Sequence, residues 1–143
     1  MSKIIQNAIR VLEDGEILVS SHVHDYVSHV TKTGKMYAVD GGREYLRRVF
    51  PSIPSNEDGN TPPIYEDLSL DIDDNSLNEI LDELLWGTYG KDGKSPLKWK
   101  FIKDLELDHL EAIISDLNND KYKISKWHDY VIRYWRLIKT LED

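Results

Sequence analysis

The chain has 143 residues, with 18 Lys and Arg against 26 Asp and Glu and a formal net charge of −8. A hydrophobic fraction of 40% excludes wholesale disorder, and no apolar run approaches the roughly 20 residues that cross a bilayer. Cysteine is absent, which excludes disulfides, thiolate catalysis and Cys-ligated zinc. The first residues have no apolar signal sequence, so we expect a cytoplasmic protein without a membrane partner.

The first 50 residues are expected to form a small antiparallel β-sheet. Apolar runs flank the pair Asp14-Gly15, and Asp-Gly in that position is typical of a β-hairpin turn. Two alternating segments on either side of Gly34 predict a second hairpin. The sheet would therefore have three or four strands, expected at residues 5–12, 17–20, 25–31 and 35–39.

A short helical segment is predicted at residues 43–50, after the pair Gly41-Gly42. The two glycines permit close backbone approach and suggest a turn that holds an anion at the start of the helix. Arginines four residues apart share a helical face and can clamp a phosphate. A purely structural turn, with arginines that balance the acidic residues, is the preferred interpretation. The ligand-binding alternative consists of Asp40, Arg43, Arg47 and Arg48.

The middle of the chain is strongly acidic. Residues 49–90 contain ten Asp and Glu and no Lys or Arg, whereas the rest of the chain has 18 basic and 16 acidic residues. We expect residues 51–75, which hold four prolines, to form an extended surface connector between a β-rich subdomain (1–50) and a mostly helical one (76–143) within one compact domain. Apolar exceptions that would attach the connector to the body are Ile64, Tyr65, Leu68, Leu70 and Ile72.

The acidic segment has two interpretations, a solvated linker or an interaction surface. In either case, its carboxylates repel phosphates, which excludes nucleic-acid binding through this region.

The C-terminal half is predicted to hold three helices and one extra strand, which makes the fold class α+β. Ser76 with Glu79, and Asp108 with Glu111, have the spacing of capping boxes at helix starts. Residues 86–94 contain three glycines and are predicted to form a loop. We expect helices at 76–86, 108–118 and 125–141, and the strand at 97–102. The last helix carries an apolar stripe of Trp127, Tyr130, Val131, Tyr134, Ile138 and Leu141, with Trp135 exposed at its edge.

The segment His22-Val23-His24-Asp25 is the main candidate for metal chemistry. Two histidines two residues apart on a strand project to the same face, and Asp25 adds a carboxylate. Because there is no cysteine and no second ligand pair, local hydrogen bonding is the preferred interpretation, and we expect no metal or other cofactor. Patterns of P-loop, dinucleotide-binding and Ser-His-Asp enzymes are missing, and no nucleophile is evident beside His109 or His128.

Two stretches resemble proteins carried by tailed bacteriophages. The first comprises His24-Asp25-Tyr26-Val27, Val39-Asp40-Gly41-Gly42 and Tyr45-Leu46-Arg47-Arg48. It resembles small phage proteins of unassigned function, many of which look like zinc ribbons. Their cysteines are absent here, so the zinc site is not carried over. The second stretch, Trp86-Gly87-Thr88-Tyr89-Gly90-Lys91-Asp92-Gly93 with Asp108-His109-Leu110, resembles another phage module. The resemblance implies a phage origin and no particular activity.

A binding protein is therefore the leading hypothesis, in preference to an enzyme. Small phage accessory proteins of this kind inhibit a host enzyme or an anti-phage defence system in the host cytoplasm, and an acidic surface suits a basic, nucleic-acid-binding partner. Three other hypotheses stay open: capture of a phosphorylated nucleotide by the arginines, metal-dependent catalysis, and a structural role such as virion assembly. Self-association is a further open possibility for the partner. The expected partner-binding residues are Asp71, Asp73, Asp74, Asp82, Glu83 and Trp135.

Overall fold

A computed structural model describes residues 3–22, 24–49, 65–89 and 96–142. The chain divides into two compact units, Met1–Asp74 and Asn75–Asp143. Among the described residues, the first unit contains strands only, while the second contains three α-helices and a two-stranded sheet. The fold class is α+β, with an N-terminal antiparallel sheet and C-terminal helices as predicted, together with additional strands.

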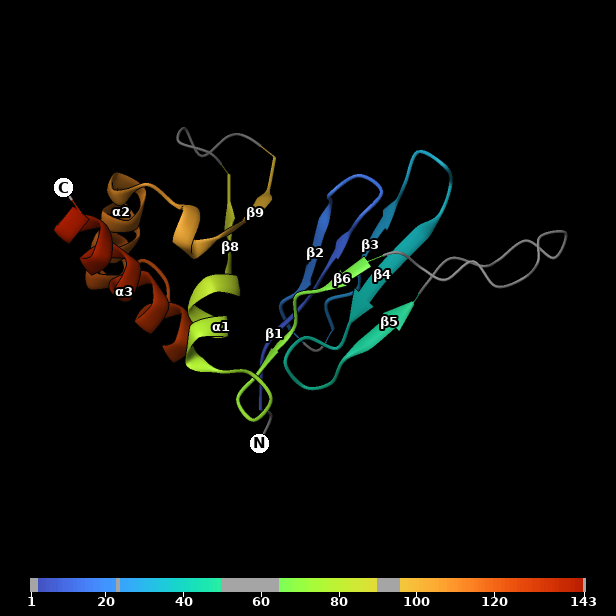
Figure 1. Cartoon of the computed structure of the whole chain (residues 1–143), viewed down its shortest axis with the longest axis horizontal. Helices are drawn as coiled ribbons and strands as arrows, with labels where there is room; N and C mark the ends of the chain where they lie inside the picture. The colour runs from blue at the N-terminus through green and yellow to red at the C-terminus, as the bar shows by residue number, and fades with distance from the viewer. Residues whose placement is uncertain (1–2, 23, 50–64, 90–95, 143) are drawn as a thin grey trace, which may run out of the picture. The chain divides into compact units, whose positions relative to one another are not determined.

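The first sheet is built around β1 (Ile4–Val11). β2 (Ile17–Ser20) pairs with it on one side through the turn predicted at Asp14-Gly15, where Gly15 has a φ of 77°. On the other side, β1 pairs with β6 (Tyr65–Asp67) and then β7 (Leu70–Asp71), all antiparallel (Figure 1). β1 is therefore a central strand, and most of its side chains are buried.

The second sheet has the order β3 (Val27–Val30), β4 (Met36–Asp40), β5 (Arg47–Val49), again antiparallel. The helix predicted at 43–50 is wrong. The amides of Glu44 and Tyr45 both donate to the carbonyl of Gly41, which makes a single turn. The backbone then pairs with β4, so the hydrogen bonds that a helix needs are used in the sheet.

The core of the first unit lies where strands of the two sheets meet. Ile9 and Val11 of β1 and Leu18 of β2 pack with Tyr37 and Val39 of β4 in one buried cluster. Burial of these apolar side chains provides the main driving force that holds the sheets together.

The described part of the predicted connector, residues 65–75, supplies β6 and β7 to the first unit and then turns at residues 72–74. Leu68 and Leu70 are fully buried and Tyr65 is half-buried, as their proposed role of attachment requires, whereas Ile72 is exposed. Ile64 lies outside the described residues.

The second unit contains three helices, a two-stranded sheet and a short 3₁₀ helix, in the order α1 (Leu77–Glu83), β8 (Leu85–Thr88), β9 (Lys98–Phe101), η1 (Ile102–Asp104), α2 (Leu107–Asn118) and α3 (Lys126–Glu142). The capping box of Ser76 and Glu79 is confirmed. The one at Asp108 is wrong, because α2 begins at Leu107 after Glu106 and has no side-chain cap.

A further correction concerns residues 85–88, where the end of the first helix and a loop were predicted. Leu85–Thr88 pairs with β9 as an antiparallel strand, with Gly87 opposite Trp99. A Cβ at Gly87 would lie 3.2 Å from the Trp99 ring, so the missing side chain leaves room for the indole. The prediction of one strand in this half therefore becomes two.

The core of the second unit is formed by apolar side chains of its helices and of β8. Leu110 and Ile113 of α2 and Val131 and Ile132 of α3 are buried, and α2 contacts α3 (Figure 1). None of the helices among the described residues is long and apolar enough to cross a membrane. Other buried members of this core are Ile80, Leu81, Leu84, Leu85, Ile102, Leu105 and Ile114.

Candidate functional site

The predicted acidic residues are divided between the two units. Asp71, Asp73 and Asp74 end the first unit, whereas Asp82 and Glu83 lie on α1 of the second. Asp73 accepts a 2.6 Å hydrogen bond from the Lys3 ammonium, and its backbone amide donates to the Asp71 carboxylate at 2.7 Å. The hydrogen bond to Asp73 and the surrounding carboxylates raise the pKa of Lys3. Asp73, Asp74 and Asp82 are exposed.

Trp135, expected to be exposed, takes part in the fold of its own unit. Its indole N–H donates to the Leu81 carbonyl at 2.8 Å, and its ring meets the edge of Tyr134 at 5.0 Å between centroids. The side chain is half-buried. Trp135 therefore joins α3 to α1, a structural role that the prediction did not include.

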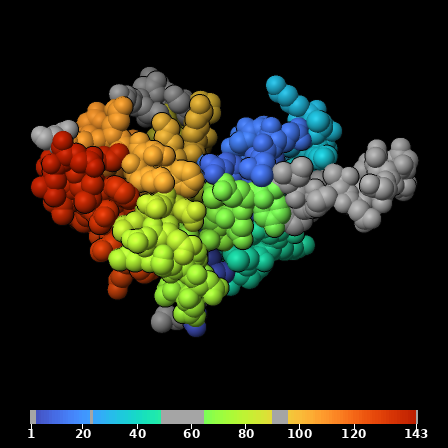
Figure 2. All heavy atoms as spheres, in the orientation of Figure 1, coloured from blue at the N-terminus to red at the C-terminus, as the bar shows by residue number. Residues whose placement is uncertain are grey.

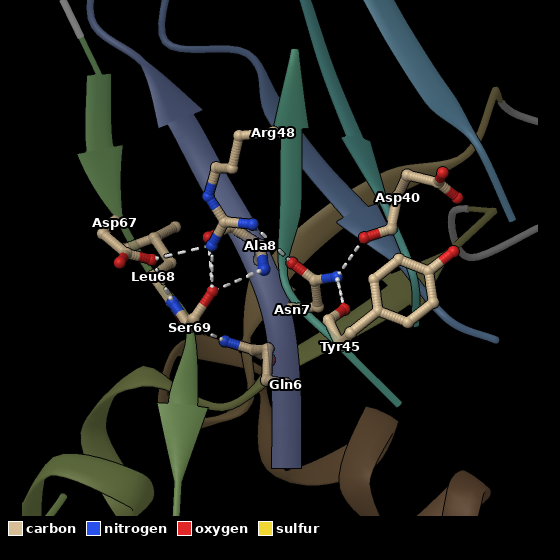
Figure 3. Close-up of polar contacts among 9 residues, drawn as sticks. All are labelled: Gln6, Asn7, Ala8, Asp40, Tyr45, Arg48, Asp67, Leu68 and Ser69. Atoms are coloured by element: carbon tan, nitrogen blue, oxygen red, sulfur yellow. Dashed lines mark hydrogen bonds and ion pairs between the residues drawn. The ribbon is translucent and has the colours of Figure 1, made fainter. Parts of the chain in front are cut away.

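Arg48 of the proposed ligand-binding set is held inside a polar network on β1 (Figure 3). Its guanidinium donates to Asn7 Oδ1 at 2.8 Å, to Asp67 Oδ1 at 3.1 Å and to the Ser69 hydroxyl. Only 11% of the Arg48 side chain is exposed. Three donors are thus directed inward, and Arg48 is a structural residue.

The network continues from Asn7, whose side chain is fully buried. Its amide donates to the backbone carbonyls of Asp40 at 2.8 Å and Tyr45 at 3.3 Å, while its oxygen accepts from Arg48 (Figure 3). Nearby, Gln6 donates to the Leu68 carbonyl at 2.8 Å. Asn7 and Arg48 therefore join β1 to β4, β5 and the strands at 65–71. Sequence reasoning missed this role because the two residues lie far apart in the chain.

The turn Gly41-Gly42 does not form the predicted anion site. The amide of Gly41 donates to the Asp40 carboxylate and that of Gly42 to the Ser20 hydroxyl, both at 2.8 Å. A Cβ on Gly42 would lie 2.2 Å from the backbone carbonyl carbon of His22. These glycines are needed for close packing, and their N–H groups are already used inside the protein.

The remaining arginines do not form the expected clamp. Arg43 is exposed in the turn after Gly42, while Arg47 is on β5 with its guanidinium 3.8 Å from the Asp40 carboxylate. Because residues 43–50 are not a helix, Arg43 and Arg47 share no helical face. The geometric basis for phosphate capture by this set is thereby lost.

His22, His24 and Asp25 lie outside the strands, before β3, so the strand geometry that would project both histidines to one face is not formed. The amide of Asp25 donates to the His22 carbonyl at 2.9 Å, and the Asp25 carboxylate accepts from the Ser21 amide at 2.8 Å. His22 and His24 are exposed. Within the parts of the chain that the structure describes, no group of three His, Asp or Glu is arranged to hold a metal ion.

His128, for which no neighbouring nucleophile was predicted, does lie beside a hydroxyl. Ser125 Oγ is 2.6 Å from His128 Nδ1 and accepts the His128 backbone N–H at 3.0 Å. The Trp86 ring lies 6.4 Å from the imidazole, between centroids. Ser125 directly precedes α3, and a hydroxyl that accepts from the third helical N–H is a helix N-cap. We therefore assign this pair to capping.

α3 has two apolar faces, and the predicted stripe combined residues of both. Val131 and Ile132 are buried against the rest of the unit. Tyr130 and Leu141 of the predicted stripe are 48% and 74% exposed, as is Leu137 at 53%. Atoms of α3, red in Figure 2, occupy a large part of the surface drawn for the second unit. The outer face is the most extended apolar feature that the described residues leave exposed on one element.

Comparison with protein-family models, with curated proteins and with solved structures found no match. The bacteriophage resemblance therefore stays a prediction.

Proposed function

We propose that the protein is a phage accessory binding protein that inhibits a host enzyme or defence component by occupying a basic surface on it. Support comes from exposed carboxylates on each of the two units. Asp73, Asp74 and Asp82 are exposed, and Lys3 is the only cation paired with any of the three in the described residues. Carboxylates left in solvent without cations repel one another, and a basic partner relieves that repulsion.

Electrostatic attraction between such surfaces acts mainly on the association rate. Because single exposed ion pairs contribute only about 0–1 kcal/mol, one substitution has little effect and several must be combined. The test variant replaces each Asp by Asn and the Glu by Gln at Asp71, Asp73, Asp74, Asp82 and Glu83.

The experiment begins with capture of a stoichiometric partner from host lysate, and association rates with that purified partner are then measured at several salt concentrations. We expect the test variant to associate more slowly and with a flatter salt dependence. A control with the same number of charges removed, at five exposed positions of the second unit outside this set, is expected to retain both properties. An unchanged rate and salt dependence in the test variant refutes the proposal. The control positions are Asp104, Glu106, Asp108, Glu111 and Asp120.

A further inference from the structure

The outer face of α3 has the spacing of a coiled-coil seam. Its five apolar residues are separated alternately by three and four positions, which are the a and d positions of consecutive heptads. Within this set, Tyr130, Leu137 and Leu141 are exposed, while the other two are half-buried. The Trp127 and Tyr130 rings lie 6.3 Å apart in an edge-to-face arrangement. We call Trp127, Tyr130, Tyr134, Leu137 and Leu141 the outer seam.

One side of the outer seam is bordered by basic residues. Lys126 and Arg133 directly precede its two half-buried members, at the g position of the heptad, which lies beside a partner helix. Arg133 is paired with Asp129 at 2.9 Å. Lys126 forms no ion pair with any residue that the structure describes. Residues 121–141 contain six Lys and Arg and one Asp, in a chain of net charge −8.

A second copy of the chain is a poor occupant for this seam. An antiparallel pair of α3 helices sets Lys126 and Arg133 against their own counterparts, which is a contact between like charges. A parallel pair sets them against Val131 and Ile138, of which Val131 is buried in its own unit. Neither arrangement gives the cations a carboxylate.

We propose that the outer seam of α3 binds an amphipathic helix of a partner protein whose apolar residues are bordered by Asp and Glu. The apolar residues of that helix pack on Tyr130, Leu137 and Leu141, and its carboxylates meet Lys126 and Arg133. Such a helix removes exposed apolar surface and supplies a counter-charge to Lys126 in the same contact. This surface is distinct from the acidic residues on which the proposed function rests.

Two synthetic helical peptides of about three heptads test the proposal, one with Leu at a and d and Glu at e and g, the other with Lys in place of Glu. Binding to the full chain is measured by isothermal titration calorimetry. We expect the Glu peptide to bind and the Lys peptide to bind at least about tenfold more weakly. Equal binding of the two peptides, or no binding of the Glu peptide, refutes the proposal. Dimerisation of the chain alone through α3, or binding to anionic phospholipid vesicles that Leu137→Glu abolishes, also overturns it.

Variants assign the contact to α3. Leu137→Glu is expected to weaken binding of the Glu peptide roughly tenfold or more, because it places a negative charge in the outer seam opposite a negatively charged peptide. Leu12→Glu is the matched control, because Leu12 is also 53% exposed but belongs to the first unit. The double variant Lys126→Glu with Arg133→Glu is expected to shift preference toward the Lys peptide, and an unchanged preference contradicts the charge argument. The variant without the five acidic side chains should bind the Glu peptide normally, which separates this inference from the proposed function.

Discussion

Replacing Asn7 by alanine removes three hydrogen bonds from the interior of the first unit. Its side chain is fully buried, donates to the Asp40 and Tyr45 carbonyls, and accepts from the Arg48 guanidinium. With a net contribution of about 1 kcal/mol per hydrogen bond, Asn7→Ala should lower the free energy of unfolding of this unit by about 3 kcal/mol.

Arg48→Met keeps an apolar stem but removes the guanidinium, and we expect a loss of about 2–3 kcal/mol. Because the contact between Asn7 and Arg48 is lost only once in the double variant, the two effects should fall short of additivity by about 1 kcal/mol. Arg47→Met is the matched control. The Arg47 side chain is 63% exposed and lies 3.8 Å from a carboxylate, so Arg47→Met should lower the free energy of unfolding by less than about 1 kcal/mol.

Amide hydrogen exchange measures opening of the first unit at β1 and β4. Tryptophan fluorescence provides an internal control, because all four Trp lie in the second unit. Faster exchange in these strands without a change in the fluorescence transition is the expected result. If Arg48→Met exchanges no faster than Arg47→Met, or if the double variant is strictly additive, the network does not stabilise the unit as argued.

Three further predictions concern single positions. Gly42→Ala should destabilise the first unit by about 3 kcal/mol or more, because its φ is 54° and a Cβ would collide with the His22 backbone. Gly34→Ala, where nothing lies within 4 Å, should cost only about 1 kcal/mol when both variants are measured by hydrogen exchange, and equal losses contradict the packing argument. Burial, with a smaller effect of Lys100, lowers the pKa of His109, so the neutral imidazole is favoured in the fold. Stability from His109 is therefore present above its ordinary pKa of about 6.5 and is lost as the pH falls through the lowered value. Urea denaturation at about pH 7.5 and 5.5 should show this loss for the natural chain and less of it for His109→Gln. Ser76→Ala removes the cap of α1 and should lower the stability of the second unit by about 1 kcal/mol in a fluorescence-monitored denaturation, whereas no change would mean that the cap contributes nothing.

The sequence predicts those parts of the fold that depend on neighbouring residues. The hairpins at Gly15 and Gly34 follow from turn chemistry, and both glycines have the positive φ that such turns require. The Ser76 cap is likewise a local signal. By contrast, β5 forms because residues 47–49 pair with β4. The local backbone preference of a short segment that includes Tyr45 and Leu46 does not predict that pairing.

The candidate site is less predictable for the same reason. Arg48 has the side chain of a phosphate ligand, and only the distant Asn7 and Ser69 show that its donors are already used. In α3, periodicity identifies apolar residues but not which of two apolar faces is buried. The choice is made by packing on α2 and η1, which selects Val131 and Ile132 and leaves Leu137 outside.

The central place of β1 has a consequence for the order in which the chain folds during synthesis. One neighbour of this strand, β2, follows within a few residues, whereas its other neighbours are residues 65–71. Contacts so distant in sequence slow folding, since the intervening loop must close before they form. A nascent chain that ends before residue 65 leaves one edge of β1 without hydrogen-bond partners, and an open strand edge is prone to aggregate. The first unit therefore completes its fold only after the acidic residues 65–74 have left the ribosome. These residues bring their negative charges to the open edge of β1 when they pair with it.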